Sequence, residues 1–410
     1  MKNLNLKIAY ISYELPPDIP KGGIGTYTLQ AAELMYEKGN EVHIFAGSYT
    51  RTISENIHGI IIHRIKCINP KNFTEKLLET FASVHEKINF DIVECPEIHN
   101  HGFGIKEKFP KINLVVRLHA PNYLVESLKK KYTPFTAKLR FVLGALRRGR
   151  FDLGYWRKYD HKSDTECQFT KLADVITTPS KTMKDWVVKN WEMDASTIVV
   201  IPNPFTPPLA LLHLPIHKEA IHKKIVFFGR LNVLKGLVNA TLAMKKILLE
   251  YPEYGFTIIG DDGPGPYNKV TMRQWMQLQF EEVKKQITFL DGQTYEKLPL
   301  AIADAEIALL PSLFESFSYT CAEAMVAGKA VVGTINTGME DIIEHSKNGI
   351  LVNAENIEEI YKATKQYIDN NELRYIIAIN ARKDISIKYD ASTIGNQYID
   401  FYKSVMPNFE

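Results

Sequence analysis

The chain has 410 residues, of which 45% are hydrophobic and 24% are charged, and its formal net charge is +3 at pH 7. This length exceeds what one hydrophobic core usually supports, so two domains are the default expectation. The small net charge excludes a chain built throughout as a polyanion binder, and no apolar run approaches the roughly 18 residues that a membrane span needs.

The first predicted unit is a strand at residues 6–12, a helix at 26–38 and a second strand at 42–46. A glycine cluster, Gly22-Gly23-Ile24-Gly25, lies in the turn that opens the helix. Such a turn lets backbone amides approach an anion closely. The spacing of these glycines fits neither the dinucleotide fingerprint nor a Walker loop, so a purely structural tight turn is an equal interpretation.

Two further predicted strands end in polar side chains. Residues 91–95 lead into Glu97, His99 and His101, and residues 113–118 lead into His119. Open α/β sheets bind their ligands at the carboxyl ends of strands, so these side chains are candidate site residues. A histidine there can donate to a sugar hydroxyl or a phosphate. The alternatives are a surface loop at 97–101 and a structural role for His119.

Residues 124–162 form a strongly basic segment. They contain eleven basic and three acidic residues, a net charge of +8, interleaved with aromatic and aliphatic side chains. This composition suits a basic amphipathic surface near anionic lipid headgroups or an anionic acceptor. A solvated helical insertion that covers the N-terminal core is the alternative. No nucleic-acid-binding motif is present, so we expect no nucleic-acid partner.

A proline-containing stretch at residues 206–222 is typical of a linker. A buried strand at 225–228 follows, and then Gly229-Arg230-Leu231, Lys235-Gly236 and a helix to about residue 251. Arg230 and Lys235 therefore lie near a helix N-terminus, where two cations can clamp a diphosphate. The next strand, 256–259, ends at Gly260, which lets the backbone approach a nucleotide.

The stretch from Pro311 to Val352 carries the clearest chemistry. A strand at 307–310 ends at Pro311, and a helix is predicted at 319–326 with Gly328 as its stop. Glu315 lies in the loop and Glu323 on the helix, so both can face one ligand, and carboxylates accept hydroxyls of a ribose or a hexose. The alternative is that Glu315 caps the helix and Glu323 lies on a solvated face.

The pattern Glu315-Ser316-Phe317-Ser318, followed by Glu323 and Ala327-Gly328, resembles the glutamate-pair signature of glycosyltransferase family 4. The resemblance covers roughly residues 7 to 400. It implies an α/β GT-B fold, in which two Rossmann-like domains face each other across a cleft. The implied domains are an acceptor domain at 1–205, a linker at 206–222, a donor domain at 223–390, and a C-terminal helix at 391–410 that returns to the N-terminal domain.

The resemblance also implies roles for individual residues. His119 lies beside the transferred sugar, Arg230 and Lys235 neutralise the departing diphosphate, and with Glu315 these are the expected catalytic residues. The expected donor-binding residues are Gly22, Gly23, Ile24, Gly260, Gln293, Ser316, Phe317, Ser318, Tyr319, Thr320 and Glu323. Glu97 and His99 border the acceptor.

The expected activity is that of a retaining hexosyltransferase. The donor is a nucleotide-diphosphate sugar, with UDP as the expected nucleotide and GDP as an open alternative. The acceptor is a saccharide or a lipid-linked acceptor. The expected role is surface polysaccharide synthesis. Asp261-Asp262 could suggest a metal, but the family needs none, so we expect neither metal nor cofactor. A GT-B sugar-nucleotide epimerase and a non-catalytic sugar-nucleotide binder are the alternatives.

The four cysteines have neither metal-ligand spacing nor the density of a disulfide framework. A reducing cytoplasm is therefore the expected compartment. The basic segment at 124–162 adds the expectation of peripheral contact with the inner face of the membrane.

Overall fold

The computed structural model describes residues 5–19, 22–152, 154–156, 158–267, 269–294 and 296–406. The chain divides into two compact units. The N-terminal unit comprises residues up to 122, 160–206 and from 388 onward, and the C-terminal unit comprises 123–159 and 207–387. The division after Thr206 lies next to the expected linker. Most of the basic segment, which we expected in the N-terminal domain, groups with the C-terminal unit instead.

The described residues of the N-terminal unit form an eight-stranded sheet in the order β3-β4-β2-β1-β5-β6-β7-β8. All neighbours pair in parallel except β3 and β4. The strands are β1 (Lys7–Ser12), β2 (Glu41–Ser48), β3 (Ile53–Ile57), β4 (Ile60–Lys66), β5 (Ile92–Pro96), β6 (Asn113–Arg117), β7 (Val175–Thr178) and β8 (Ile198–Val200). The central strands are almost continuously buried, as strands covered on both faces must be.

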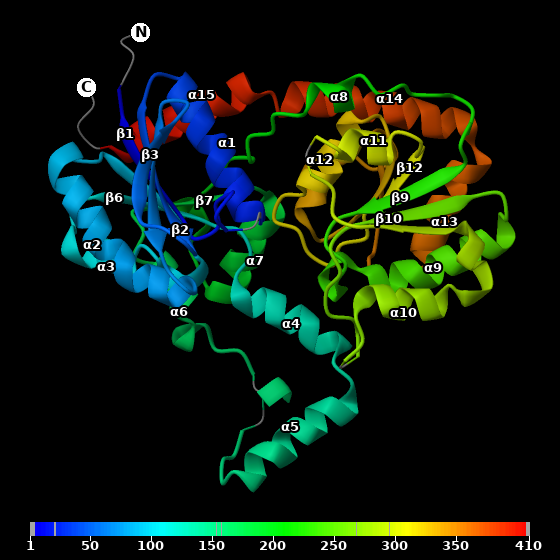
Figure 1. The fold of residues 1–410 in the computed structure, drawn as a ribbon, viewed down its shortest axis with the longest axis horizontal. Helices are drawn as coiled ribbons and strands as arrows, with labels where there is room; N and C mark the ends of the chain where they lie inside the picture. Colours follow the sequence, from blue (N-terminus) through cyan, green and yellow to red (C-terminus); the bar gives the residue numbers. More distant parts are fainter. Residues whose placement is uncertain are drawn as a thin grey trace. The chain divides into compact units, whose positions relative to one another are not determined.

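Helices cover this sheet: α1 (Gly23–Glu37), α2 (Pro70–Ile88), α3 (Phe103–Lys108), α6 (Thr165–Thr170), α7 (Lys181–Trp191) and α15 (Ala391–Val405). The C-terminal helix α15 lies against α1 in Figure 1 and contributes Tyr398 and Tyr402 to the core of this unit. Their hydroxyls bond to Tyr27 at 3.0 Å and to the buried carboxylate of Glu94 at 2.9 Å. A buried carboxyl group thus finds hydroxyl donors, among them Tyr402 from a distant part of the chain.

Helix α1 begins at Gly23, three residues before the expected start. The glycine cluster therefore forms the N-cap and first turn of the helix rather than a turn before it. A Cβ at Gly25 would lie 2.7 Å from the carbonyl oxygen of Glu14, and one at Gly22 would overlap the Glu14 carboxylate. The glycines let the helix start against the loop that follows β1.

The described residues of the C-terminal unit form a six-stranded, parallel sheet in the order β11-β10-β9-β12-β13-β14. Its strands are β9 (Lys224–Phe228), β10 (Gly255–Ile259), β11 (Ile287–Leu290), β12 (Ile307–Leu309), β13 (Ala330–Thr334) and β14 (Ile350–Val352). Its helices are α4 (Asn122–Tyr132), α5 (Phe135–Arg147), α8 (Leu209–Leu212), α9 (Leu237–Glu250), α10 (Met272–Gln279), α11 (Leu298–Ile302), α12 (Tyr319–Val326), α13 (Ile357–Asp369) and α14 (Asn371–Lys388).

Each sheet has a point where the strand order reverses. In the N-terminal unit β1 pairs with both β2 and β5, and in the C-terminal unit β9 pairs with both β10 and β12. The loops that leave the carboxyl ends of such neighbouring strands diverge and form the usual ligand crevice of an open α/β sheet. No helix among the described residues combines the length and the apolar character needed to cross a membrane.

Candidate active site

Two predicted catalytic residues meet in the C-terminal unit. Lys235 ends a short 3-10 helix, η5 (Val233–Lys235), in the loop after β9, and Glu315 lies in the loop after β12. Lys235 Nζ donates to Glu315 Oε1 at 2.5 Å, and Ser312 Oγ donates to the same oxygen at 2.8 Å. Both charged side chains are mostly shielded from water. The structure therefore joins a cation and a carboxylate at the reversal point of this sheet.

Two glycines allow these loops to approach each other. Gly236 has φ +67, and a Cβ there would lie 1.7 Å from the carbonyl oxygen of Pro311. Gly338 donates its amide to the Glu315 carbonyl at 2.6 Å, and a Cβ there would lie 2.1 Å from the Ser316 carbonyl oxygen. A side chain at either position would push the Glu315 loop out of place.

The predicted donor-binding residues at 316–320 form the entry to α12. Ser318 is its N-cap and accepts from the Cys321 amide at 3.3 Å, and its hydroxyl lies 3.1 Å from that of Thr320. Phe317 is buried, and its ring meets that of Tyr319 edge to face with centroids 5.1 Å apart. Glu323 lies partly buried in the second turn of this helix. The fold thus brings both predicted glutamates to one loop and helix.

Arg230 and Gly260 lie directly beyond neighbouring strand ends. Arg230 is exposed in the loop after β9. A Cβ at Gly260, after β10, would lie 1.8 Å from the Gly229 carbonyl oxygen, so these two loops are in close contact. Gln293 Nε2, after β11, donates to the Asp291 carbonyl at 2.8 Å. All three therefore lie on the same edge of the sheet as Lys235.

Arg273 on α10 is a residue that sequence reasoning missed. Its Nη2 donates to Asp291 Oδ1 at 2.8 Å and to the Gly260 carbonyl at 3.4 Å, and its guanidinium lies over the Phe289 ring at 5.6 Å. It thereby ties the loops after β10 and β11 together. No local pattern marks it, because its partners are 13 and 18 residues away in the chain.

In the N-terminal unit, Glu97 and His119 lie at the carboxyl ends of β5 and β6. Glu97 is fully buried, and both of its oxygens accept from the His119 amide at 3.0 Å, while Oε1 also accepts from the Ala120 amide at 2.7 Å. The Glu97 carboxyl is thus engaged by the backbone that carries His119, and its expected contact with an acceptor stays a prediction. Glu97 is a positioning residue here.

A second buried carboxyl supports the same loop. Glu166 accepts from the Asn122 amide at 2.8 Å, from Asn122 Nδ2 at 2.5 Å and from the His99 amide at 3.4 Å. Burial, and secondly the nearby Glu166, raise the pKa of Glu97 to about 8. The hydrogen bonds that Glu97 accepts from backbone amides lower its pKa and only partly offset this rise. Burial also raises the pKa of Glu166. The segment from His119 to Asn122 is therefore held by two carboxyl groups.

The His119 ring is nearly buried, and it meets the Tyr27 ring edge to face with centroids 5.2 Å apart. Burial lowers the pKa of His119 to about 3, and the neighbouring Arg117 adds to this shift. The imidazole is therefore neutral at physiological pH, with one nitrogen able to donate and the other able to accept. It suits a contact with a hydroxyl better than a charge contact with a phosphate.

The other predicted residues of this unit fall at its loop ends. His99 is exposed in a left-handed backbone conformation, φ +63, on the loop after β5. His101 is buried, and its Nδ1 lies 2.6 Å from Thr74 Oγ1, which makes it structural. Gly22, Gly23 and Ile24 form the start of α1, and the space around the Gly23 position is open.

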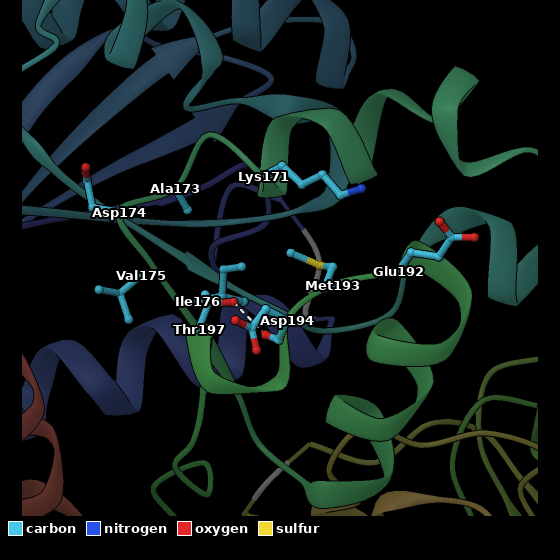
Figure 2. Close-up of a pocket in the computed structure, with 9 residues that line it drawn as sticks. All are labelled: Lys171, Ala173, Asp174, Val175, Ile176, Glu192, Met193, Asp194 and Thr197. Carbon is cyan, nitrogen blue, oxygen red and sulfur yellow. Dashed lines mark hydrogen bonds between the residues drawn. The ribbon is translucent and has the colours of Figure 1, made fainter.

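A cavity of about 240 Å³ lies elsewhere in this unit (Figure 2). It is lined from Lys171 to Thr197 around the amino ends of β7 and β8, the opposite edge of the sheet from His119. Its carboxylates already have partners in the fold: Asp174 accepts from Lys106 Nζ at 2.6 Å, Asp194 accepts from the Ser196 amide at 2.9 Å, and Glu192 lies 3.6 Å from His161 Nε2. We therefore assign this cavity no ligand.

In the part of the chain that the structure describes, no three carboxylate, imidazole or thiol groups are placed to hold a metal ion. Asp262 instead accepts from the Arg273 amide at 3.0 Å. The four cysteines are buried and free.

Two Rossmann-like units carry cation, carboxylate and imidazole side chains at the carboxyl ends of their strands. Family models identify the class of protein as the glycosyltransferases. The model for glycosyl transferases group 1 matches residues 216–384, and that for glycosyltransferase family 4 matches residues 21–207. The chain belongs to this family of glycosyltransferases, which confirms the predicted family, fold class and transferase activity.

Individual proteins agree over the full chain. An uncharacterized glycosyltransferase of Methanocaldococcus jannaschii is 25% identical, over 98% of this chain and 99% of that protein. The structure of sucrose-phosphate synthase from Thermosynechococcus elongatus matches with a TM-score of 0.76 at 18% identity, covering 98% of this chain and 99% of that one. Anabaena HepE in complex with UDP and glucose matches with a TM-score of 0.66 at 18% identity, covering 97% and 100%.

Proposed function

We propose that this glycosyltransferase is a retaining, metal-independent hexosyltransferase that uses a UDP-sugar and a saccharide or lipid-linked saccharide acceptor, in surface polysaccharide synthesis. The contact between Lys235 and Glu315 carries the donor half of the proposal, because it places a cation and a hydroxyl acceptor at one sheet edge. The solved structure of Anabaena HepE with UDP and glucose supports the choice of UDP. Retention and the acceptor class follow from the family resemblance.

The chemistry requires stabilisation of a leaving group. The bond from the anomeric carbon to the diphosphate oxygen breaks, a bond to the acceptor oxygen forms, and the acceptor hydroxyl proton passes to the departing diphosphate. Negative charge therefore grows on the diphosphate in the transition state, and fixed cations that meet this charge lower the barrier. We assign this task to Lys235 and Arg230, beside the start of α9.

The pair between Lys235 and Glu315 gives a reason for coupling donor binding to sugar recognition. A diphosphate that engages Lys235 Nζ releases Glu315 Oε1, which then accepts from hydroxyls of the sugar. Ser312, which donates to the same oxygen, keeps the carboxylate oriented during this exchange. Glu323 on α12 is assigned to the ribose of the nucleotide.

His119 supplies a neutral imidazole for a hydroxyl of the transferred sugar. Its low pKa means that this contact does not change with protonation across the physiological range. Glu97 fixes the backbone on both sides of this contact by accepting from the His119 and Ala120 amides. A loss of Glu97 should therefore act on the sugar through His119.

A donor-binding assay on paired lysine variants tests the proposal. Thermal unfolding is followed with UDP, GDP and their sugars, and release of the nucleotide is then measured for any hit. A ligand at 100 times its Kd stabilises the fold by about 2.7 kcal/mol. We expect a UDP-sugar to raise Tm in the wild type, and Lys235→Met to weaken its binding about 10- to 100-fold, the range for losing a charge-assisted hydrogen bond.

Lys246→Met is the matched control. Lys246 lies on α9 and pairs with Glu358 at 2.8 Å, and both side chains are about half exposed. Because this pair lies outside the proposed donor site, Lys246→Met should leave donor binding unchanged. The donor half of the proposal is rejected if no nucleotide sugar shifts Tm at millimolar concentration, and the transfer itself is rejected if a donor binds without any release of UDP. The anomeric configuration of the product by NMR tests retention, and an unchanged rate in EDTA tests metal independence.

A further inference from the structure

Residues 123–159, which we call the basic arm, are rooted on the C-terminal unit. Helix α4 leads into α5, which lies apart from the sheet of this unit in Figure 1. Tyr132, at the end of α4, packs against the core of the unit and accepts from Asn239 Nδ2 at 3.3 Å. The Tyr123 and Tyr159 rings stack with centroids 3.3 Å apart, so the two ends of the arm meet. The arm is therefore a built element with a fixed root.

Helix α5 carries an apolar stripe that remains largely exposed, although the Phe135 ring meets that of Trp156 edge to face. Positions i, i+4, i+8 and i+11 lie on one helix face. The stripe consists of Phe135, Leu139, Leu143 and Leu146, which are 68%, 43%, 56% and 49% exposed. The other side of α5 is already used, because the Phe141 ring packs edge to face on that of Tyr155. The stripe is thus left over after the arm has formed its own contacts.

Cations flank this stripe without acidic partners. Residues 127–151 contain eight basic residues and no acidic residue. Lys129 and Lys131 pair with Glu126 and Glu355. The other six, which are Lys130, Lys138, Arg140, Arg147, Arg148 and Arg150, form no ion pair within the described ranges. By helical spacing, Arg140 and Arg147 lie along one side of the stripe and Lys138 along the other.

We propose that the basic arm docks on the surface of a bilayer that contains anionic lipid. An amphipathic helix with apolar residues on one face and Lys or Arg beside them lies in the interface, with the apolar face at the boundary of headgroups and acyl chains. With 13 residues, α5 is about 20 Å long at 1.5 Å per residue, too short to span a hydrocarbon core of about 30 Å. Helix α5 therefore lies on the membrane rather than across it.

The charge and the stripe together select a lipid surface over other partners. A second copy of this chain would bring two arms of the same sign together, which like-charge repulsion opposes. A nucleic acid would satisfy the cations but would leave the aliphatic stripe in water. Further exposed aromatic side chains of the arm, Phe151 at 78% and Trp156 at 44%, suit the headgroup region as well.

Co-sedimentation of the full chain with vesicles tests the docking without any donor. Vesicles of phosphatidylcholine alone are compared with vesicles of phosphatidylcholine and phosphatidylglycerol, at low and high salt. Each cation near an anionic surface is worth about a fivefold change in partitioning, so replacing Lys138, Arg140 and Arg147 with Gln should weaken binding to the anionic vesicles about 100-fold. The matched control replaces three exposed lysines of the same unit, Lys284, Lys285 and Lys362, with Gln, and should bind as the wild type does.

A second variant and a local probe separate docking from simple charge attraction. The double variant Leu139→Ser, Leu143→Ser keeps every cation but should reduce vesicle binding, because it removes apolar side chains from the stripe. Both side chains are exposed, so their loss costs the fold little. Trp156, whose ring lies 6.1 Å from that of Phe135, should shift its emission to shorter wavelength on anionic vesicles, and Trp156→Phe should remove this shift.

The proposal is overturned by any of four results. The wild type fails to sediment with anionic vesicles, the arm and control charge variants bind alike, or light scattering shows that the stripe closes a dimer that does not bind vesicles. A preference for RNA or DNA over vesicles at equal salt would also overturn it. Because the readout is vesicle binding, its failure leaves the donor assay and the transferase activity unaffected.

Discussion

The substitution Glu97→Gln tests the claim that a buried, protonated carboxyl positions His119. With its pKa raised to about 8 in the folded protein, Glu97 holds a proton that the unfolded chain, with an ordinary value of 4.5, releases. Unfolding therefore releases a proton between these values, and the free energy of unfolding falls as pH rises through this window. One proton changes it by about 1.4 kcal/mol per pH unit, so the loss approaches roughly 5 kcal/mol by pH 8.

A glutamine side chain keeps an oxygen that can accept hydrogen bonds from the His119 and Ala120 amides. Unlike the carboxyl group, this side chain does not titrate. The stability of Glu97→Gln relative to the wild type should therefore increase with pH from about 5 to 8. Urea unfolding at several pH values, followed by the fluorescence of Trp186 and Trp191 on α7 of the same unit, measures this difference. Glu107→Gln, which removes an exposed carboxylate on α3, is the control and should track the wild type. Parallel curves for the wild type and Glu97→Gln would refute the reasoning.

Two further substitutions address the supports of the site. Gly236→Ala should destabilise the C-terminal unit by about 2 kcal/mol or more, because a non-glycine residue is strained in the left-handed conformation and its Cβ would clash with the Pro311 carbonyl. Calorimetry with and without donor measures this loss, and an unchanged Tm would contradict the close approach of the two loops. Tyr402→Phe removes the hydroxyl contacts with Glu94 and Tyr10, so it should lower the free energy of unfolding of the N-terminal unit by about 1–3 kcal/mol. Urea unfolding measures this change, and a neutral result would mean that water replaces the hydroxyl.

Local signals explain why part of the candidate site could be predicted. The helix expected at residues 319–326 is α12, because Ser318 supplies a cap and Gly328, with φ +69, ends the helix. The apolar runs before Arg230 and before Pro311 are buried parallel strands in both cases. Such features depend on a few neighbouring residues, which is why a single sequence reveals them.

Other elements depend on contacts that no local pattern records. The predicted elements do not include strand β3, since this segment is short and mostly exposed, and its antiparallel pairing with β4 makes it a strand. The early start of α1 follows from the approach of Gly25 to Glu14. The grouping of residues 123–159 with the C-terminal unit follows from contacts such as that of Tyr132 with Asn239, which are 107 residues apart.

The sequence by itself indicated the family, through the resemblance of its motifs, many of the strands and helices around the site, and the residues that lie at the strand ends. These follow from hydrophobic periodicity, glycine and cap positions, and motif spacing. Tertiary structure alone decided which of these residues meet. It joined Lys235 to Glu315 across 80 positions and turned Glu97 inward to the His119 amide. Strand order and burial decide such contacts, because they arise from packing of the whole sheet and not from any one segment.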